Sequence, residues 1–205
     1  MPGLRLVSIN IERSRHLDRV IPFIQSVKPD VLCIQELEEP DVRQIEEACG
    51  LDVVFCPLGV VPKSPRHLHD NVVQGVGIFA LGIRASAAHF YRGSAEAALT
   101  TKDRLLQNFA VLVADIERDG VHYRIATTHF TWVDGGGVSD QQRMDLVRMQ
   151  NVLDTMGEFV LCGDFNAPRG GEIFGKLAAK YKDNIPEEYV WSIDQSLHRA
   201  EPGAL

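Results

Sequence analysis

The chain has 205 residues, of which 45% are hydrophobic and 24% charged, values typical of a soluble globular domain with a sizeable core. A net charge of −7 argues against tight, sequence-independent binding to nucleic acid. No stretch approaches the roughly 18 consecutive apolar residues of a membrane-spanning helix, and no signal-peptide pattern opens the chain. We therefore expect one domain over residues 1–205 that acts in the cytoplasm, away from membranes and without an obligate protein partner.

The cysteines are consistent with that location. They are scattered without Cys-x-x-Cys spacing, and two of them fall inside apolar runs that predict strands. We interpret them as reduced core residues and not as zinc ligands or disulfides. The four are Cys33, Cys49, Cys56 and Cys162.

Hydrophobic periodicity predicts strands and helices in irregular alternation. Strands are predicted at Leu4–Ile9, Val31–Gln35, Val53–Cys56, Val72–Phe79, Phe109–Glu117, Val121–His129 and Phe159–Cys162. Helices are predicted at Ser14–Val27, Asp41–Cys49, Ser139–Met156 and Glu172–Tyr181. Asp119-Gly120 is a hairpin turn signal between two of the strands. This order predicts an α/β fold with mixed sheets whose outer faces are covered by helices.

The longest predicted helix is Ser139–Met156. Ser139 is a good N-cap residue, because its hydroxyl can accept a hydrogen bond from a free backbone N–H in the first turn. We expect Met144 and Val147 to contribute to the apolar face of this helix, together with Val152 and Met156.

Polar residues that a strand does not require stand at four predicted strand ends. One such residue is ordinary turn chemistry, whereas four ends together predict a site built on rigid elements. The residues are Asn10 and Glu12, then Glu36, then Thr128 and His129, then Asp164 and Asn166. Such an oxygen-rich set favours Mg²⁺ or Mn²⁺ over zinc.

Four short motifs follow one another along the chain: Ser8-Ile9-Asn10, Ile34-Gln35-Glu36, Thr127-Thr128-His129-Phe130 and Gly163-Asp164-Phe165-Asn166. In this order and at these spacings they resemble the endonuclease/exonuclease/phosphatase superfamily, over nearly the whole chain. The resemblance implies a DNase I-like, four-layer sandwich of two mixed β-sheets flanked by helices. It also implies metal-dependent hydrolysis of phosphodiester or phosphomonoester bonds, with Mg²⁺ or Mn²⁺ as the cofactor.

The resemblance also implies roles for single residues. Glu36 corresponds to the principal metal ligand with Asn10 beside it, and Glu12 is a candidate further member of the metal shell. Asp164 corresponds to the residue that orients or deprotonates the attacking water. Asn166 corresponds to the one that steadies the phosphate.

His129 corresponds to the histidine that donates a hydrogen bond to a phosphoryl oxygen. From the residues alone, a strand-end histidine without catalytic function is the favoured interpretation. Two further residues are candidate substrate contacts: Trp132, beside a glycine-rich segment, and Arg169, just after the Asp164–Asn166 pair. Each is also compatible with an ordinary loop or turn.

The end of the chain departs from the superfamily pattern. Asp194 resembles the aspartate that supports a catalytic histidine, but the Ser-Asp-His motif and final strand that should follow do not occur. We therefore expect a C-terminally truncated member that lacks its last strand.

Two classes of function stay open. The first is a metal-dependent phosphoric ester hydrolase, acting on a small phosphate ester rather than on nucleic acid, since no basic face is indicated. The second is a catalytically impaired relative that serves as a binding or scaffold module.

Overall fold

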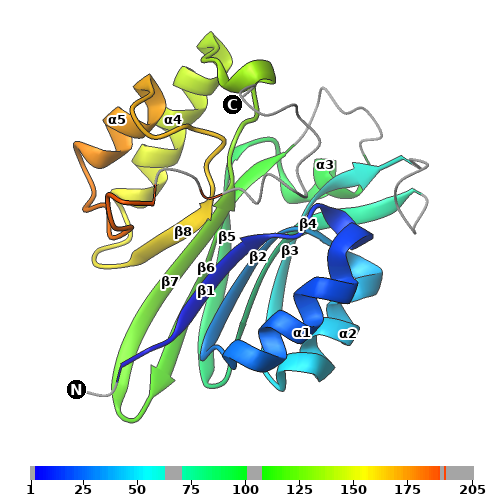
Figure 1. The fold of residues 1–205 in the computed structure, drawn as a ribbon. Coiled ribbons are helices and arrows are strands. Elements are labelled where there is room, and N and C mark those ends of the chain that lie inside the picture. The colour runs from blue at the N-terminus through cyan, green and yellow to red at the C-terminus, as the bar shows by residue number, and fades with distance from the viewer. Residues whose placement is uncertain (1–2, 63–70, 101–107, 190–191, 193–205) are drawn as a thin grey trace.

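The computed structural model describes residues 3–62, 71–100, 108–189 and 192 (Figure 1). The strands are β1 (Leu6–Asn10), β2 (Val31–Glu38), β3 (Asp52–Val61), β4 (Val72–Ala80), β5 (Ile83–Arg92), β6 (Phe109–Arg118), β7 (Val121–His129) and β8 (Val160–Asp164). The α-helices are α1 (Leu17–Val27), α2 (Val42–Cys49), α3 (Ala95–Thr100), α4 (Asp140–Leu153) and α5 (Glu172–Ala178). Short 3₁₀ helices occupy Arg13–His16, Glu39–Asp41 and Asp134–Gly136.

The strands form two four-stranded sheets, with the orders β1-β2-β4-β3 and β5-β6-β7-β8. Each sheet contains one parallel pair, β1 with β2 and β7 with β8, and its other pairs are antiparallel. Both sheets are therefore mixed, as the sequence predicts.

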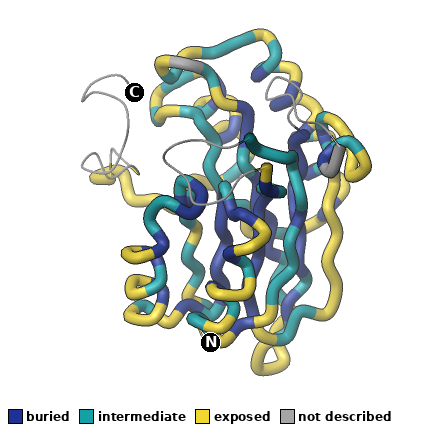
Figure 2. Tube along the Cα trace, turned by 90° about the vertical axis from the view of Figure 1, so that its right-hand side faces the viewer, coloured by how far each residue is buried: buried dark blue, intermediate teal, exposed yellow. Residues whose placement is uncertain are grey.

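Three apolar clusters divide the molecule into four layers. One cluster lies between the two sheets and includes Val31, Ile78, Leu112 and Ile125. A second packs α1 and α2 against the first sheet, and a third packs α4 and α5 against the second sheet. Figure 1 shows the two helix pairs on opposite outer faces, and Figure 2 shows the buried strands between them. The predicted four-layer α/β sandwich is confirmed.

The structure contains two elements that periodicity does not predict, β5 and the short helix α3. β5 is an edge strand, and most of its residues are exposed. Its sequence shows no strong apolar alternation, since residues 85–88 are Ala-Ser-Ala-Ala. Periodicity therefore misses this strand, which joins the sheet through backbone hydrogen bonds to β6.

The prediction for the apolar face of α4 is wrong in part. Ser139 does cap the helix, since its Oγ accepts a hydrogen bond from Gln142 N at 3.1 Å. Met144 and Val147 are 47% and 57% exposed, however. The buried side of the helix carries Leu146 and Met149, and also the polar residues Gln142 and Asp145. A search for apolar residues at helical spacing misses the buried face of α4, because part of that face consists of polar residues.

All four cysteines are free, and of these Cys33 and Cys56 are buried in the core, whereas Cys49 and Cys162 are partly exposed. None of the helices in the described part of the chain is long and apolar enough to cross a membrane.

An ion pair between α4 and α5 makes the stability depend on pH. Arg143 donates from Nη2 and Nε to the Glu172 carboxylate at 2.7 and 2.9 Å, and Lys176 donates at 2.7 Å. The hydrogen bonds from Arg143 and Lys176 lower the pKa of Glu172 from 4.5 to about 2. Because the folded pKa is below the unfolded one, this stabilisation is complete above pH 4.5 and is lost as the pH falls to about 2.

We expect Arg143→Met to make the free energy of unfolding less steeply dependent on pH in this acid range. Urea unfolding at a series of pH values measures the slope. Arg43→Met is the control, because Arg43 pairs with Glu47 within the single helix α2 and is fully exposed to solvent screening. Equal slopes for the parent and Arg143→Met would show that the α4–α5 pair does not govern the acid response.

Candidate active site

The ends of four strands meet at one side of the sandwich. β1 and β2 run parallel, as do β7 and β8, so each parallel pair brings its C-terminal ends together. Asn10 ends β1, and His129 and Asp164 are directly paired at the ends of β7 and β8. Glu36 comes from β2. The structure thus brings together four residues that the sequence places in separate motifs.

The carboxamide of Asn10 joins two carboxylates from opposite sheets. Its Nδ2 donates to Glu36 Oε1 at 3.1 Å and to Asp164 Oδ2 at 2.8 Å. His129 Nε2 lies 3.9 Å from the same two carboxylate oxygens. The side chains of Glu36, His129 and Asp164 are 23%, 23% and 30% exposed, so the cluster is partly desolvated yet reachable from solvent.

Glu36 is predicted to follow the strand that ends at Gln35, but it lies within β2, which continues to Glu38. The pairing of β2 with β4 is interrupted between Ile34 and Leu37, and Glu36 has a φ of 56° at this irregularity. A bulge re-aims the side chains of a strand, and a left-handed conformation is costly for a residue other than glycine. The backbone is therefore distorted at the point where the Glu36 carboxylate turns toward Asn10 and Asp164.

Asn166 is held beside Asp164 by its own backbone. Its N–H donates to Asp164 Oδ1 at 2.9 Å, and its Nδ2 donates to the carbonyl of Phe130 at 2.9 Å. Its φ is 47°, the second left-handed residue at the site. Gly163 precedes this turn at a φ of 142°, and a Cβ there would lie 2.1 Å from the carbonyl oxygen of Thr128. Only glycine permits β7 and β8 to approach so closely.

Gln35 connects the two sheets directly beneath this cluster. It is 1% exposed, and its Nε2 donates to Ser8 Oγ at 3.2 Å and to Thr127 Oγ1 at 3.0 Å. No role for Gln35 is predicted from the sequence, although its place next to Glu36 in a buried strand is the available signal.

Other candidates point elsewhere. The Glu12 carboxylate pairs with Arg15 Nη1 at 2.8 Å and His16 Nε2 at 3.2 Å, and its backbone N–H donates to Asn10 Oδ1 at 2.9 Å. Arg169 donates to Asp183 and to the carbonyls of three residues of the segment 185–189. Its guanidinium is thus used to hold that segment.

Trp132 follows β7 and is 61% exposed, three residues after His129. Asp194 lies outside the described residues, so the structure does not place it.

The donor set of the cluster suits a hard divalent cation. Mg²⁺ prefers oxygen ligands and retains several waters, so one or two carboxylates suffice to bind it. Glu36 and Asp164 supply such oxygens on either side of Asn10. Among the described residues there is no group of three or more His, Cys, Asp or Glu side chains arranged to hold an ion. Asn10 faces the carboxylates with its N–H group while its Oδ1 accepts from Glu12 N at 2.9 Å, so binding metal through oxygen would require the amide to turn over.

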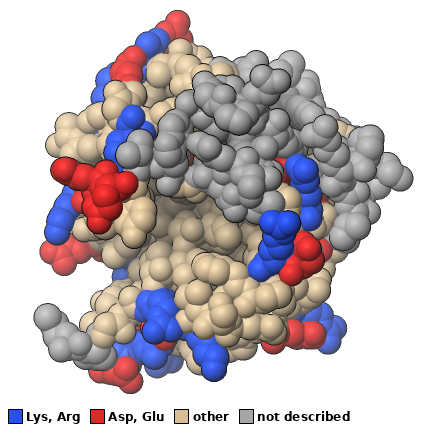
Figure 3. Space-filling view, in the orientation of Figure 1, with Lys and Arg blue, Asp and Glu red and all other residues tan. Residues whose placement is uncertain are grey.

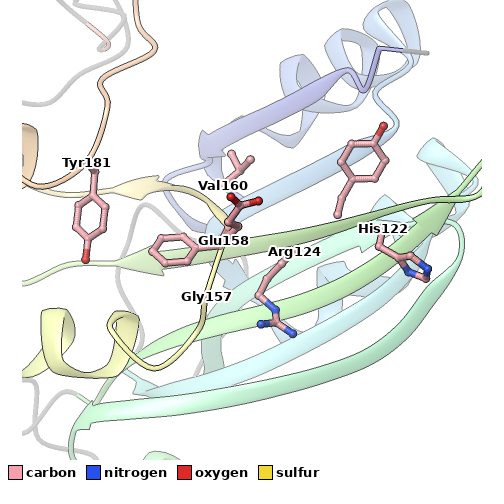
Figure 4. Close-up of a pocket in the computed structure, with 8 residues that line it drawn as sticks. His122, Arg124, Gly157, Glu158, Val160 and Tyr181 are labelled. Atoms are coloured by element: carbon pink, nitrogen blue, oxygen red, sulfur yellow. The ribbon is translucent and has the colours of Figure 1, made fainter. Parts of the chain in front are cut away.

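A separate hollow of about 490 Å³ opens at the other end of β7 and β8 (Figure 4). His122, Arg124, Glu158, Val160 and Tyr181 contribute to its lining. His122 is seven residues before His129 along β7, about 23 Å at the usual rise of a strand. This hollow is therefore remote from the carboxylate cluster.

Comparison with known proteins identifies the family of this chain. A family model described as the Endonuclease/Exonuclease/phosphatase family matches residues 7–202. No curated protein matches the chain significantly in sequence.

Several solved structures share the fold. A functionally unknown conserved protein from Enterococcus faecalis is 15% identical with a TM-score of 0.64, and the match covers 88% of this chain and 73% of that one. A mannosyl-6-phosphatase from Bacteroides thetaiotaomicron is 13% identical with a TM-score of 0.61, covering 87% and 71%. The human Nocturnin catalytic domain with a bound sulfate anion is 22% identical with a TM-score of 0.59, covering 87% and 69%.

At these identities the structural likeness concerns the fold, and the family model supplies the assignment. Because that model spans nearly the whole chain, and the two mixed sheets and their helices are arranged as in these structures, the chain belongs to the endonuclease/exonuclease/phosphatase family.

Proposed function

We propose that this protein is a divalent-metal-dependent hydrolase of phosphodiester or phosphomonoester bonds. One observation carries the proposal: a single amide from Asn10 holds Glu36 and Asp164 side by side, with His129 Nε2 3.9 Å from both. Hydrolysis of an anionic ester requires an oriented water, neutralisation of phosphate charge and hydrogen-bond donors for the charge that develops. The cluster offers a residue for each requirement.

Asp164 is the proposed residue for the water. Its Oδ1 is occupied by the Asn166 amide and its Oδ2 by Asn10, so both bonds fix the carboxylate plane. A carboxylate held in this way can align a water through its remaining lone pairs and accept its proton during attack.

His129 and Asn166 are the proposed donors to the phosphate. The imidazole faces the carboxylate cluster through Nε2, the atom that would donate to a phosphoryl oxygen. The Asn166 carboxamide has two N–H donors, and Phe130 uses one of them. Both side chains extend from rigid strand ends, which limits the entropy lost when substrate binds.

Glu36 is the proposed principal metal ligand, for Mg²⁺ or Mn²⁺. The bound ion would neutralise phosphate charge and polarise the phosphoryl group. Asn10 would act mainly by holding the Glu36 and Asp164 carboxylates at a fixed separation.

A small phosphate ester is the proposed substrate. On the face shown in Figure 3, Lys and Arg of the described residues alternate with Asp and Glu instead of forming one continuous basic surface. Two structural relatives motivate the choice of test compounds, because one is named as a sugar phosphatase and the other holds sulfate, which has the shape of phosphate. A non-catalytic binding module is less well supported, since such a role does not require the Asn10 bridge between the two carboxylates.

The first test is hydrolysis of a panel of mono- and diesters of phosphate with Mg²⁺ or Mn²⁺, by the parent and by Asp164→Asn. We expect the variant to lose at least ~100-fold in kcat, the usual share of general-base catalysis. Its thermal stability should change little, because removal of one of two neighbouring negative charges offsets the loss of one of the two hydrogen bonds that the carboxylate accepts. Asp52→Asn, an exposed residue at the start of β3, is the control with the same chemical change. Near-normal turnover by Asp164→Asn would exclude Asp164 as the residue that activates water.

The second test concerns the metal. We expect Glu36→Gln to weaken Mg²⁺ binding at least ~10-fold in titration calorimetry, because a charged oxygen ligand is replaced by a neutral amide. Glu47→Gln, an exposed change on α2, should leave the affinity unchanged. Equal affinity of the parent and Glu36→Gln would place the ion elsewhere, whatever the enzymatic activity.

A further inference from the structure

Gln142 of α4 contacts both loops that leave the candidate active site. Its Nε2 donates to the carbonyl of Thr131, in the loop after β7, at 2.9 Å. The same nitrogen donates to the carbonyl of Asn166, after β8, at 3.1 Å. Its side chain is completely buried, so solvent does not compete for either bond.

The oxygen of the same carboxamide, Gln142 Oε1, is buried and lacks a hydrogen bond from any of the described residues. Both of its neighbours at Nε2 are carbonyl oxygens, which require a donor, so exchanging the two ends of the amide would lose both hydrogen bonds. A buried acceptor without a protein partner costs free energy. An apolar residue of similar volume would remove that acceptor but would also remove the donor from the carbonyls of Thr131 and Asn166, so the side chain is retained for its two donated bonds.

Asn166 is the residue that benefits. A φ of 47° lies in the left-handed region, which asparagine tolerates better than other residues with a side chain but which the surrounding contacts must still favour over extended or helical backbone. Its backbone N–H is bound by Asp164, its side chain by the Phe130 carbonyl and its own carbonyl by Gln142. Gln142 is the member of this set that comes from outside the two strands and their loops.

The neighbouring residue on the same helix face supports the assignment. Asp145, also fully buried, accepts from Thr131 Oγ1 at 2.6 Å and pairs with Arg92 Nη1 at 2.7 Å. Asp145 therefore fixes the Thr131 side chain while Gln142 binds its carbonyl. Thr131 becomes a firm point from which Gln142 can restrain Asn166.

We propose that Gln142 is a positioning residue for the hydrolysis assigned above: it holds Asn166 in the conformation in which its carboxamide meets the phosphate. The inference rests on the proposed function for its catalytic part, whereas the restraint on Asn166 can be measured without substrate.

The test compares Gln142→Met with Gln150→Met. Methionine has nearly the volume of glutamine but lacks the donor. Gln150 lies two turns further along the same helix and is half-buried, so the control carries the same chemical change away from both loops. We expect Gln142→Met to remain folded, with a Tm within a few degrees of the parent. Hydrogen exchange of the Asn166 amide should be at least ~10-fold faster, because its loop is released. The value of kcat should fall at least ~10-fold with little change in Mg²⁺ affinity, since displacement of a donor by a fraction of an ångström weakens transition-state contacts most.

The outcomes separate the two claims. Unchanged exchange at Asn166 in Gln142→Met would overturn the positioning role, even if no ester is hydrolysed by the parent. Faster exchange with unchanged kcat would overturn the catalytic part. A general loss of stability, with faster exchange throughout the sheets, would also overturn the proposal and assign Gln142 a purely structural role. If Gln142→Met is insoluble, Gln142→Asn retains the amide but shortens its reach by one methylene, and the same measurements apply.

Discussion

The contact between Asn10 and the carboxylates of Glu36 and Asp164 depends on how the two sheets are packed. Two neighbouring negative charges in a partly desolvated site repel each other, and a shared amide donor offsets part of that repulsion. Asn10 and Glu36 belong to one sheet and Asp164 to the other. The hydrogen bonds from Asn10 Nδ2 to Glu36 at 3.1 Å and to Asp164 at 2.8 Å therefore form only at one separation of the two sheets. A small slide of one sheet would break the bridge. The inter-sheet apolar cluster and the Gln35 hydrogen bonds to Ser8 and Thr127 oppose such a slide.

The site is also where the backbone departs from its preferred conformations. Glu36 and Asn166 have φ values of 56° and 47°, and conformations of this kind cost about 1–3 kcal/mol each. Strain of this size persists only where neighbouring contacts determine the geometry more strongly than the local backbone preference. For Asn166 those contacts come from Asp164, Phe130 and Gln142. For Glu36 the irregular pairing between β2 and β4 accommodates the turn.

Helix α4 has two functions in this architecture. Leu146, Met149 and Leu153 bury an apolar stripe against the second sheet, which anchors the helix. Gln142 and Asp145 extend the same buried face with polar groups that reach the loops after β7 and β8. The packing of the apolar stripe thus sets the position of the polar part. Because the apolar and polar residues lie on one helix, a change that shifts the helix in the core would also shift the hydrogen bonds to the loops of the site.

The sequence by itself determined most strands and helices, the α/β class and the residues of the carboxylate cluster. Strand periodicity is a local property, and polar residues at strand ends stand out from it, which is why Asn10, His129 and Asp164 could be found. Tertiary structure alone decided which of the polar candidates meet. It turned Glu12 toward Arg15 and His16 and committed Arg169 to the 183–189 segment, and it placed Glu36 inside a distorted strand. It also buried the polar face of α4 that carries Gln142. The physical reason is that a side chain's hydrogen-bond partner, or a bulge in a strand, depends on chain segments that are distant in sequence. Periodicity records only which positions within one local segment are apolar and which are polar.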